Sequence, residues 1–213
     1  MVLVETSAIY VGALLMSVVS FLASCLLFDT YHEKDLSALK NLAYFFLFYG
    51  IFQFLLGTRL LYMEMPLQQY HVYYILNHSF LYLSLAHFSK FGLFFFRSDW
   101  RDAAFWTNIS AGAVFLAVMM VFSRPITVLI AVPSLFNWLV LGTGVFVWLG
   151  VSSEDVERMK MFMMALGVFL IAVSGPLHNA VRSTVGSITV NLLTVAGTVL
   201  SLLGVYMRTT LGD

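Results

Sequence analysis

Seven apolar segments, each of about 20 residues or more, divide this chain, and most of its charged residues stand in the short stretches between them. A helix needs about 20 mainly apolar residues to cross the hydrocarbon core of a bilayer. The polar stretches are too short to form a separate soluble domain. The sequence therefore predicts an all-α integral membrane protein, in which residues 1–213 form a single bundle of seven transmembrane helices. The expected spans are 6–28, 39–62, 70–96, 103–122, 127–150, 157–182 and 185–207.

The composition agrees with this class and excludes several others. The chain is 61% hydrophobic and 10% charged, with a mean hydropathy of +0.91, whereas a soluble domain carries about 25% charged residues. The formal net charge is zero, and no basic stripe suggests a nucleic-acid partner. The single cysteine, Cys25, excludes an internal disulfide framework and a cysteine-based metal site.

The first span contains a motif that resembles a cleavage site. LASC, residues 22–25, matches a bacterial lipoprotein motif by letter, but no Lys or Arg precedes it. A signal peptide requires a positively charged n-region. We therefore expect residues 6–28 to be retained as a transmembrane helix.

The orientation follows from the distribution of Lys and Arg, which are enriched in cytoplasmic loops. Eight of these residues fall on one side of the predicted bundle and three fall on the other. The sequence therefore predicts a multi-pass protein of the cell membrane with its N-terminus outside and its C-terminus in the cytoplasm. The eight are Lys34, Lys40, Lys90, Arg97, Arg101, Arg158, Lys160 and Arg208, and the three are Arg59, Arg124 and Arg182.

Polar residues within the spans gather in the half that is expected to face outward. Polar groups in hydrocarbon are costly, so they tend to face the bundle interior and to serve function. The candidate ligand-binding residues are Gln53, Arg59, Asn77, His78, His178, Asn179, Arg182 and Asn191. The alternative is structural: Asn and Gln also bridge membrane helices, and Arg can extend to the headgroups. In the cytoplasmic half, His87 has no evident histidine partner with which it could ligate a second haem.

Two features of the last spans predict local geometry. Gly175 and Pro176 precede His178, and a proline inside a helix frees a carbonyl and bends the helix. The sixth and seventh spans are also rich in small residues, including Gly197 and Gly204. Since small residues let membrane helices approach closely, we expect these two helices to pack tightly.

Other chemistries could also use polar residues in the membrane. A covalent retinal pigment needs a lysine in the membrane, and the seventh span has none. Haem b would need two axial histidines, such as His78 and His178, and quinone would use similar residues. A zinc site could combine these two with His71, but no carboxylate lies in the middle of a span to act as base. Transport remains open, although the spans lack the Asp or Glu that ion-coupled transporters usually carry.

The sequence thus favours a non-enzymatic function. We expect a module that binds or senses a small ligand or a lipid in an outward-facing polar pocket, or else an accessory subunit of a membrane complex. In either case the protein would signal to a partner. That partner would be a cytoplasmic protein, a membrane protein or a second copy of the chain. A membrane redox subunit with haem b or quinone at His78 and His178 is the alternative, and a small-solute transporter or channel is the third.

Overall fold

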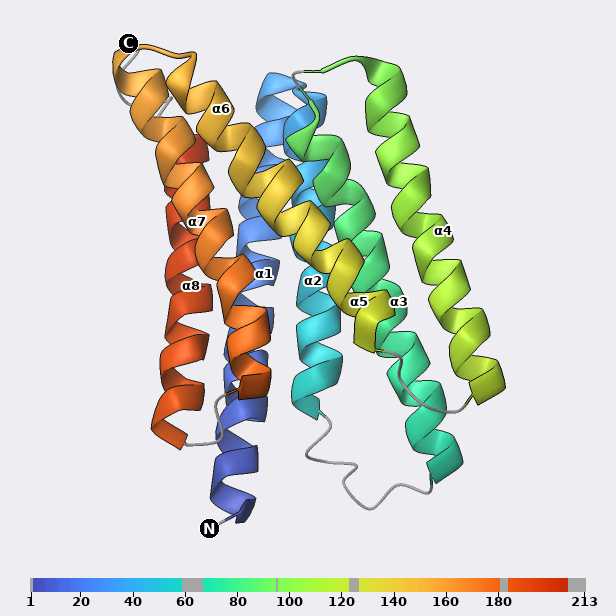
Figure 1. Cartoon of the computed structure of the whole chain (residues 1–213). Helices are drawn as coiled ribbons and strands as arrows, with labels where there is room; N and C mark the ends of the chain where they lie inside the picture. Colours follow the sequence, from blue (N-terminus) through green and yellow to red (C-terminus); the bar gives the residue numbers. More distant parts are fainter. Residues whose placement is uncertain (1, 59–66, 95, 123–126, 181–183, 207–213) are drawn as a thin grey trace. The chain divides into compact units, whose positions relative to one another are not determined.

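The described residues fold almost entirely into helices, and no strand occurs among them (Figure 1). This computed structural model describes residues 2–58, 67–94, 96–122, 127–180 and 184–206. At residues 2–9, 67–71, 122, 127–129, 131, 175–180 and 184–188 the description covers the backbone alone. The all-helical prediction is confirmed.

The helices coincide with the seven predicted segments. The fifth segment, 127–150, corresponds to three consecutive elements that continue one another without a loop. In chain order the elements are α1 (Val2–Lys34), α2 (Ser37–Thr58), α3 (Leu67–Gly92), α4 (Ser98–Phe122), α5 (Thr127–Leu135), η2 (Phe136–Gly144), α6 (Val145–Val151), α7 (Asp155–Ala180) and α8 (Thr184–Tyr206).

Two helices extend into stretches that were expected to be loops. α1 continues to Lys34 rather than ending at residue 28, and α4 begins at Ser98 rather than at residue 103. The added turns carry His32 and Lys34 at the end of α1 and Asp99 at the start of α4. These charges complement the helix dipole, so the helices continue beyond their apolar segments.

Five stretches are long and apolar enough to cross a membrane, namely Tyr10–Lys34, Ser37–Thr58, Ser98–Val121, Val132–Val151 and Thr189–Tyr206. A chain with several such helices is a multi-pass membrane protein. Within the described residues, α3 and α7 are not among these five. In α3 the reason is a series of polar residues, which lower its mean hydropathy.

By its residue contacts the chain divides into two compact units. The first, here named the α1–α4 unit, comprises Ile9–Ser134. The second, the α7–α8 unit, comprises Leu135–Asp213 together with Met1–Ala8. The expectation that residues 1–213 form a single domain stays a prediction.

The two faces of α1 differ in polarity, because the buried face combines serines with larger apolar residues such as Met16 and Leu27. One face exposes large aliphatic residues at helical spacing: Val11, Leu15, Val18, Leu22 and Leu26. The other buries small residues such as Ser20 and Ser24 against α2, where Ser24 Oγ donates a hydrogen bond to Ala43 O at 3.0 Å. Apolar residues outside and polar residues inside are the pattern of a helix surrounded by lipid.

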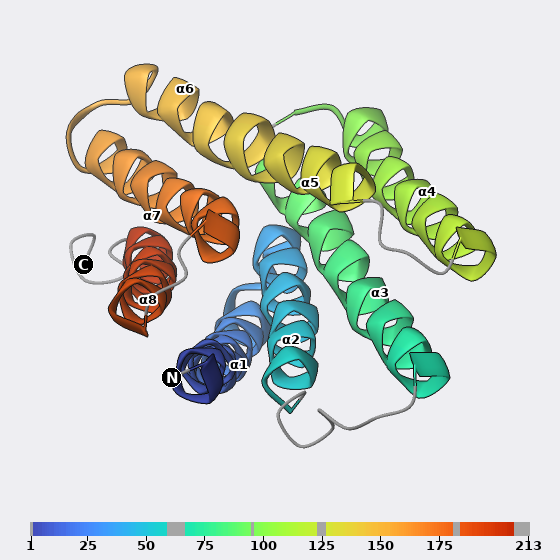
Figure 2. The same cartoon turned by 60° about the horizontal axis from the view of Figure 1, so that its bottom comes forward.

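Within the α1–α4 unit, α3 lies between α2 and α4 (Figures 1 and 2). The hydroxyl oxygens of Thr58 and Tyr73 are 2.8 Å apart where α2 ends and α3 begins. Tyr82 from α3 and Phe115 and Met119 from α4 form a buried apolar cluster. α3 is thus covered on two sides, which lets it bury side chains that a lipid-facing helix would not carry.

In the α7–α8 unit the two long helices approach closely at glycines, which confirms the prediction of tight packing. A Cβ atom on Gly167 would lie 2.5 Å from Gly197 O and 2.7 Å from Ser201 N. A Cβ atom on Gly204 would lie 3.0 Å from Lys160 O. Only glycine leaves room for the facing backbone at such distances.

α7 continues through Gly175 and Pro176 to Ala180. The Gly175–Pro176 pair therefore does not end the helix. The predicted bend at Pro176 stays a prediction.

A π-helix, η2, occupies the middle of the fifth segment and was not predicted. Thr143 Oγ1 donates to Trp138 O, five residues earlier, at 3.1 Å, which is the spacing of π-helical geometry. Pro133 lies inside α5, one turn before Asn137 in η2. The proline has no N–H to donate, and the sequence offers no further indication of the wider turn.

Candidate functional site

α3 carries a series of polar residues into the interior of the α1–α4 unit. Buried polar groups need hydrogen-bond partners, and the serines of α3 find theirs on their own helix. Ser84 Oγ donates to Leu81 O, and Ser89 Oγ donates to Ala86 O, both at 2.7 Å. Asn77, His78 and His87 also belong to α3, and their side chains are buried or half-buried.

His78 is buried and is held by its own helix and by aromatic rings. Its Nδ1 lies 2.9 Å from Tyr74 O, and since a carbonyl only accepts, Nδ1 carries the hydrogen. The imidazole stacks on the Tyr74 ring with centroids 4.0 Å apart, and the Phe115 ring of α4 lies at 5.4 Å. Nε2 has no hydrogen-bond partner among the described residues. The ring is therefore fixed with one nitrogen available to a ligand.

Among the described residues of the predicted site, Asn77 is the one with an unpaired buried polar atom. It is 3% exposed, and its Oδ1 accepts no hydrogen bond from any described residue. Leaving a buried acceptor unpaired costs about 1–3 kcal/mol. In folded proteins such atoms often mark a bound water, ion or other group. Ser20 Oγ of α1, fully buried, is the second atom of this kind within the described residues.

Two other residues of the predicted site have described side chains. Gln53 is half-buried, and its Nε2 donates to Tyr49 Oη on the same helix at 2.8 Å. Asn191 is half-buried on α8, in the other unit. The structure thus brings Asn77 and His78 into the interior of one unit, with Gln53 bonded to a tyrosine.

The remaining predicted residues lie outside the described part of the chain. Arg59 and Arg182 fall in stretches that are not described, and the side chains of His71, His178 and Asn179 are not described either. The approach of His78 to His178 therefore stays a prediction.

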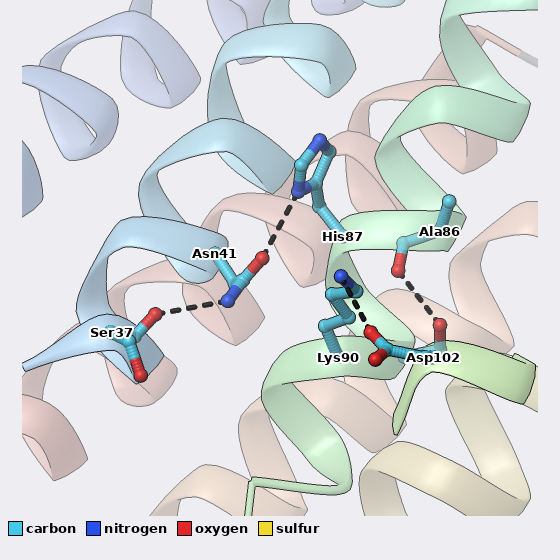
Figure 3. A network of polar contacts seen from close by, with 7 residues as sticks. Ser37, Asn41, Ala86, His87, Lys90 and Asp102 are labelled. Atoms are coloured by element: carbon cyan, nitrogen blue, oxygen red, sulfur yellow. Dashed lines mark hydrogen bonds and ion pairs between the residues drawn. The ribbon is translucent and has the colours of Figure 1, made fainter. Parts of the chain in front are cut away.

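His87 forms a hydrogen bond with Asn41 that was not predicted (Figure 3). Its Nδ1 lies 3.2 Å from Asn41 Oδ1, while Asn41 Nδ2 donates to Ser37 O at 2.9 Å. Because the amide nitrogen is engaged by a carbonyl, its oxygen faces the ring and His87 Nδ1 is the donor. The pair joins α2 to α3 across 46 positions of sequence.

Aromatic rings surround His87 on its other sides. The Tyr44, Phe48 and Phe105 centroids lie 5.0, 5.6 and 5.3 Å from that of the imidazole. Lys90 Nζ sits over the Phe105 ring at 4.6 Å and forms an ion pair with Asp102 at 2.9 Å. Figure 3 shows this ion pair beside the Asn41–His87 pair. Together these contacts join α2, α3 and α4 at the end where Lys90 stands.

The sequence contained one indication of this second cluster. Asn41 and His87 are polar residues in neighbouring helices that run antiparallel, so a residue near the start of α2 faces a residue near the end of α3. The helix boundaries alone did not determine which sides of the two helices meet. The sides that meet depend on how each helix is rotated about its own axis, and this rotation decides whether the Asn41 and His87 side chains touch.

Among the described residues, no group of three or more His, Cys, Asp or Glu side chains is placed to hold a metal ion. Comparison with family models, with curated proteins and with solved structures gave no match to this chain. The site must therefore be interpreted from its own geometry.

Proposed function

We propose that the chain is a seven-span protein of the cell membrane that recognises a small ligand or a lipid in the interior of its α1–α4 unit, without catalysing a reaction. The ligand presents a hydrogen-bond donor, such as a hydroxyl or an amine, to Asn77. Binding is passed as a signal, or as a change in assembly, to a protein partner. The N-terminus lies outside and the C-terminus lies in the cytoplasm.

The unpaired acceptor on Asn77 is the observation that carries this proposal. A buried amide oxygen without a donor is unfavourable by itself, and a ligand that donates to it removes the cost. His78, the next residue, offers Nε2 as an acceptor, while the rings of Tyr74 and Phe115 supply flat apolar contacts. A donor group on an apolar or aromatic body fits these surroundings.

The orientation is supported by the bias of Lys and Arg, eight against three. The cytoplasmic side would then include the turn between α1 and α2, the turn between α3 and α4, and the turn between α6 and α7. These turns are short and charged, so they suit contacts with a partner protein.

The test compares two variants of α3, Asn77→Leu and Ser84→Ala. We expect the purified wild type to release a small molecule on extraction, and Asn77→Leu to release much less of it. Ser84 is bonded to its own helix, so Ser84→Ala should release as much as the wild type. Mass spectrometry of the extracts makes the comparison.

Thermal unfolding gives a second result from the same samples. If a ligand satisfies Asn77, then Asn77→Leu lowers the unfolding temperature. A raised unfolding temperature in Asn77→Leu, with equal extracts from all three proteins, would show that the oxygen is simply unpaired and would refute the proposed ligand.

The geometry of His78 favours one second candidate, a redox subunit that holds haem b. Metal-binding histidines commonly donate their other ring N–H to a carbonyl, as His78 does to Tyr74. An absorption spectrum before and after dithionite tests it. A Soret band that disappears in His78→Ala would support the redox function, and a colourless protein would exclude haem at this position in the purified sample.

A further inference from the structure

A surface groove runs along α7, in the α7–α8 unit. It is lined by Asp155, Arg158, Met159, Phe162, Met163 and Leu166 and holds about 410 Å³. Ligand sites in proteins usually hold roughly 300–1,000 Å³. These residues recur at helical spacing, so the groove runs along one side of a single helix, with two charged residues at its start and apolar residues beyond them.

The start of the groove presents one positive and one negative group. Asp155 and Arg158 are both exposed, and no described residue forms an ion pair with either of them. Arg158 Nε donates to Ser153 O at 2.9 Å, which holds the side chain while the terminal nitrogens of the guanidinium remain available. The two residues are one helical turn apart, about 4.5 Å along the axis.

Asp155 also has an unusual backbone. Its φ is +44°, in the left-handed region, which non-glycine residues seldom adopt and which Asp and Asn tolerate best. Backbone strain of this kind often accompanies a functional position. Here it places an acidic residue at the start of the groove, directly after the turn that follows α6.

The rest of the groove is apolar and adaptable. Met159, Phe162 and Leu166 are exposed, although each is large and hydrophobic. Methionine side chains are flexible and fit ligands of irregular shape. The groove therefore has a charged end followed by an apolar part. This arrangement matches an amphiphile that has a charged headgroup and an apolar tail.

We propose that this groove binds a zwitterionic phospholipid with a primary-amine headgroup, such as phosphatidylethanolamine. The phosphate contacts the Arg158 guanidinium, the ammonium donates to the Asp155 carboxylate, and an acyl chain lies along Met159, Phe162 and Leu166. This inference rests on α7 being one of the seven spans proposed above. It is independent of the ligand at Asn77.

Charge complementarity selects this headgroup over two others. An anionic headgroup without an amine would place its negative charge beside Asp155, which repels it. A choline headgroup carries no N–H to donate, and proteins hold it with aromatic cages. The ring in this groove, Phe162, lies seven residues from Asp155, about 10 Å deeper along the helix. The two-carbon link between phosphate and ammonium matches the one-turn separation of Arg158 and Asp155.

The test uses the full chain in nanodiscs of equimolar palmitoyl-oleoyl phosphatidylethanolamine, phosphatidylcholine and phosphatidylglycerol. Native mass spectrometry counts the lipids that remain bound after release. We expect the wild type to retain phosphatidylethanolamine about threefold to fivefold over either competitor, the range expected of exposed charge pairs. In Arg158→Gln and in Asp155→Asn the preference should fall towards equality.

The variants are chosen to keep the fold. Asn tolerates the positive φ of residue 155, and Glu154→Gln removes a neighbouring charge outside the groove, so it should keep the preference. Equal retention of the three lipids by the wild type would overturn the proposal. So would a preference for phosphatidylglycerol, or a preference that both groove variants keep. A reporter that places the C-terminus outside would refute the proposed orientation and leave these lipid counts unaffected.

Discussion

Asn41 and His87 form a polar pair between α2 and α3 in the α1–α4 unit. The amide is oriented by Ser37 O and the ring is enclosed by aromatic side chains. The nearby ion pair of Lys90 and Asp102 is more exposed, with 30% and 61% of the two side chains accessible. Exposed ion pairs contribute about 0–1 kcal/mol. We therefore assign more of the stability at this end to the Asn41–His87 pair.

The substitution Asn41→Ala should lower the free energy of unfolding by about 0.5–1.5 kcal/mol, since it leaves His87 Nδ1 without an acceptor. Unfolding in mixed detergent micelles measures this change. Thr107→Ala is the control, because the exposed Thr107 hydroxyl bonds only to Ala103 O of its own helix. If Asn41→Ala were neutral while His87→Ala was strongly destabilising, the imidazole would act through packing rather than through this hydrogen bond.

At the scale of elements, the pairing of α7 with α8 depends on the absence of side chains. Gly167 faces the backbone of Gly197 and Ser201 at distances that no Cβ atom can adopt without movement. Close backbone approach of this kind is a source of stability for helices in lipid. The small residues of the sequence predicted this close approach, but they did not show which residues of the two helices face each other.

Gly167→Ala should therefore destabilise the protein by about 1–3 kcal/mol, because the facing atoms belong mainly to backbone and cannot rotate away. The measurement is the same micelle unfolding. Ala196→Val adds more volume to an exposed position of α8 and should change little. Equal effects of the two substitutions would show that the helices separate easily at Gly167.

Pro176 offers a second test at this scale. The substitution Pro176→Ala restores an N–H and removes the ring, so a bend caused by proline should straighten. Spin labels at positions 156 and 180, in a Cys25→Ser background, report the length of α7 by electron–electron distance measurements. A longer distance in Pro176→Ala is expected. An unchanged distance would mean that packing sets the course of the helix.

At the scale of the whole molecule, the orientation in the membrane is the property that function most depends on. A fluorescent protein fused after Asp213 should be fluorescent in the cytoplasm, and alkaline phosphatase at the same position should be inactive, because eight of eleven Lys and Arg residues lie on that side of the predicted bundle. Active phosphatase there would reverse the orientation and would place the proposed ligand site in the cytoplasmic half.

The sequence by itself determined the class of the protein and the position of its helices. Hydropathy over about 20 residues is a local property, so all seven helical segments could be located without knowing any contact. The same reasoning failed at two helix ends, because polar turns extend α1 to Lys34 and start α4 at Ser98. It also failed at η2, because the sequence shows no hydropathy pattern that would indicate the wider helical turn. It also pointed to Asn77 and His78, because polar residues inside apolar segments are rare.

Only the tertiary structure decided which polar residues meet. Asn41 reaches His87, and Gly167 lies against Gly197, because of how each helix is rotated about its axis and how far it is shifted along its neighbour. Rotation and shift result from the packing of many side chains at once, and no stretch of sequence encodes them separately. For the same reason, the unpaired oxygen of Asn77 became visible only when the surrounding helices showed that no described side chain reaches it.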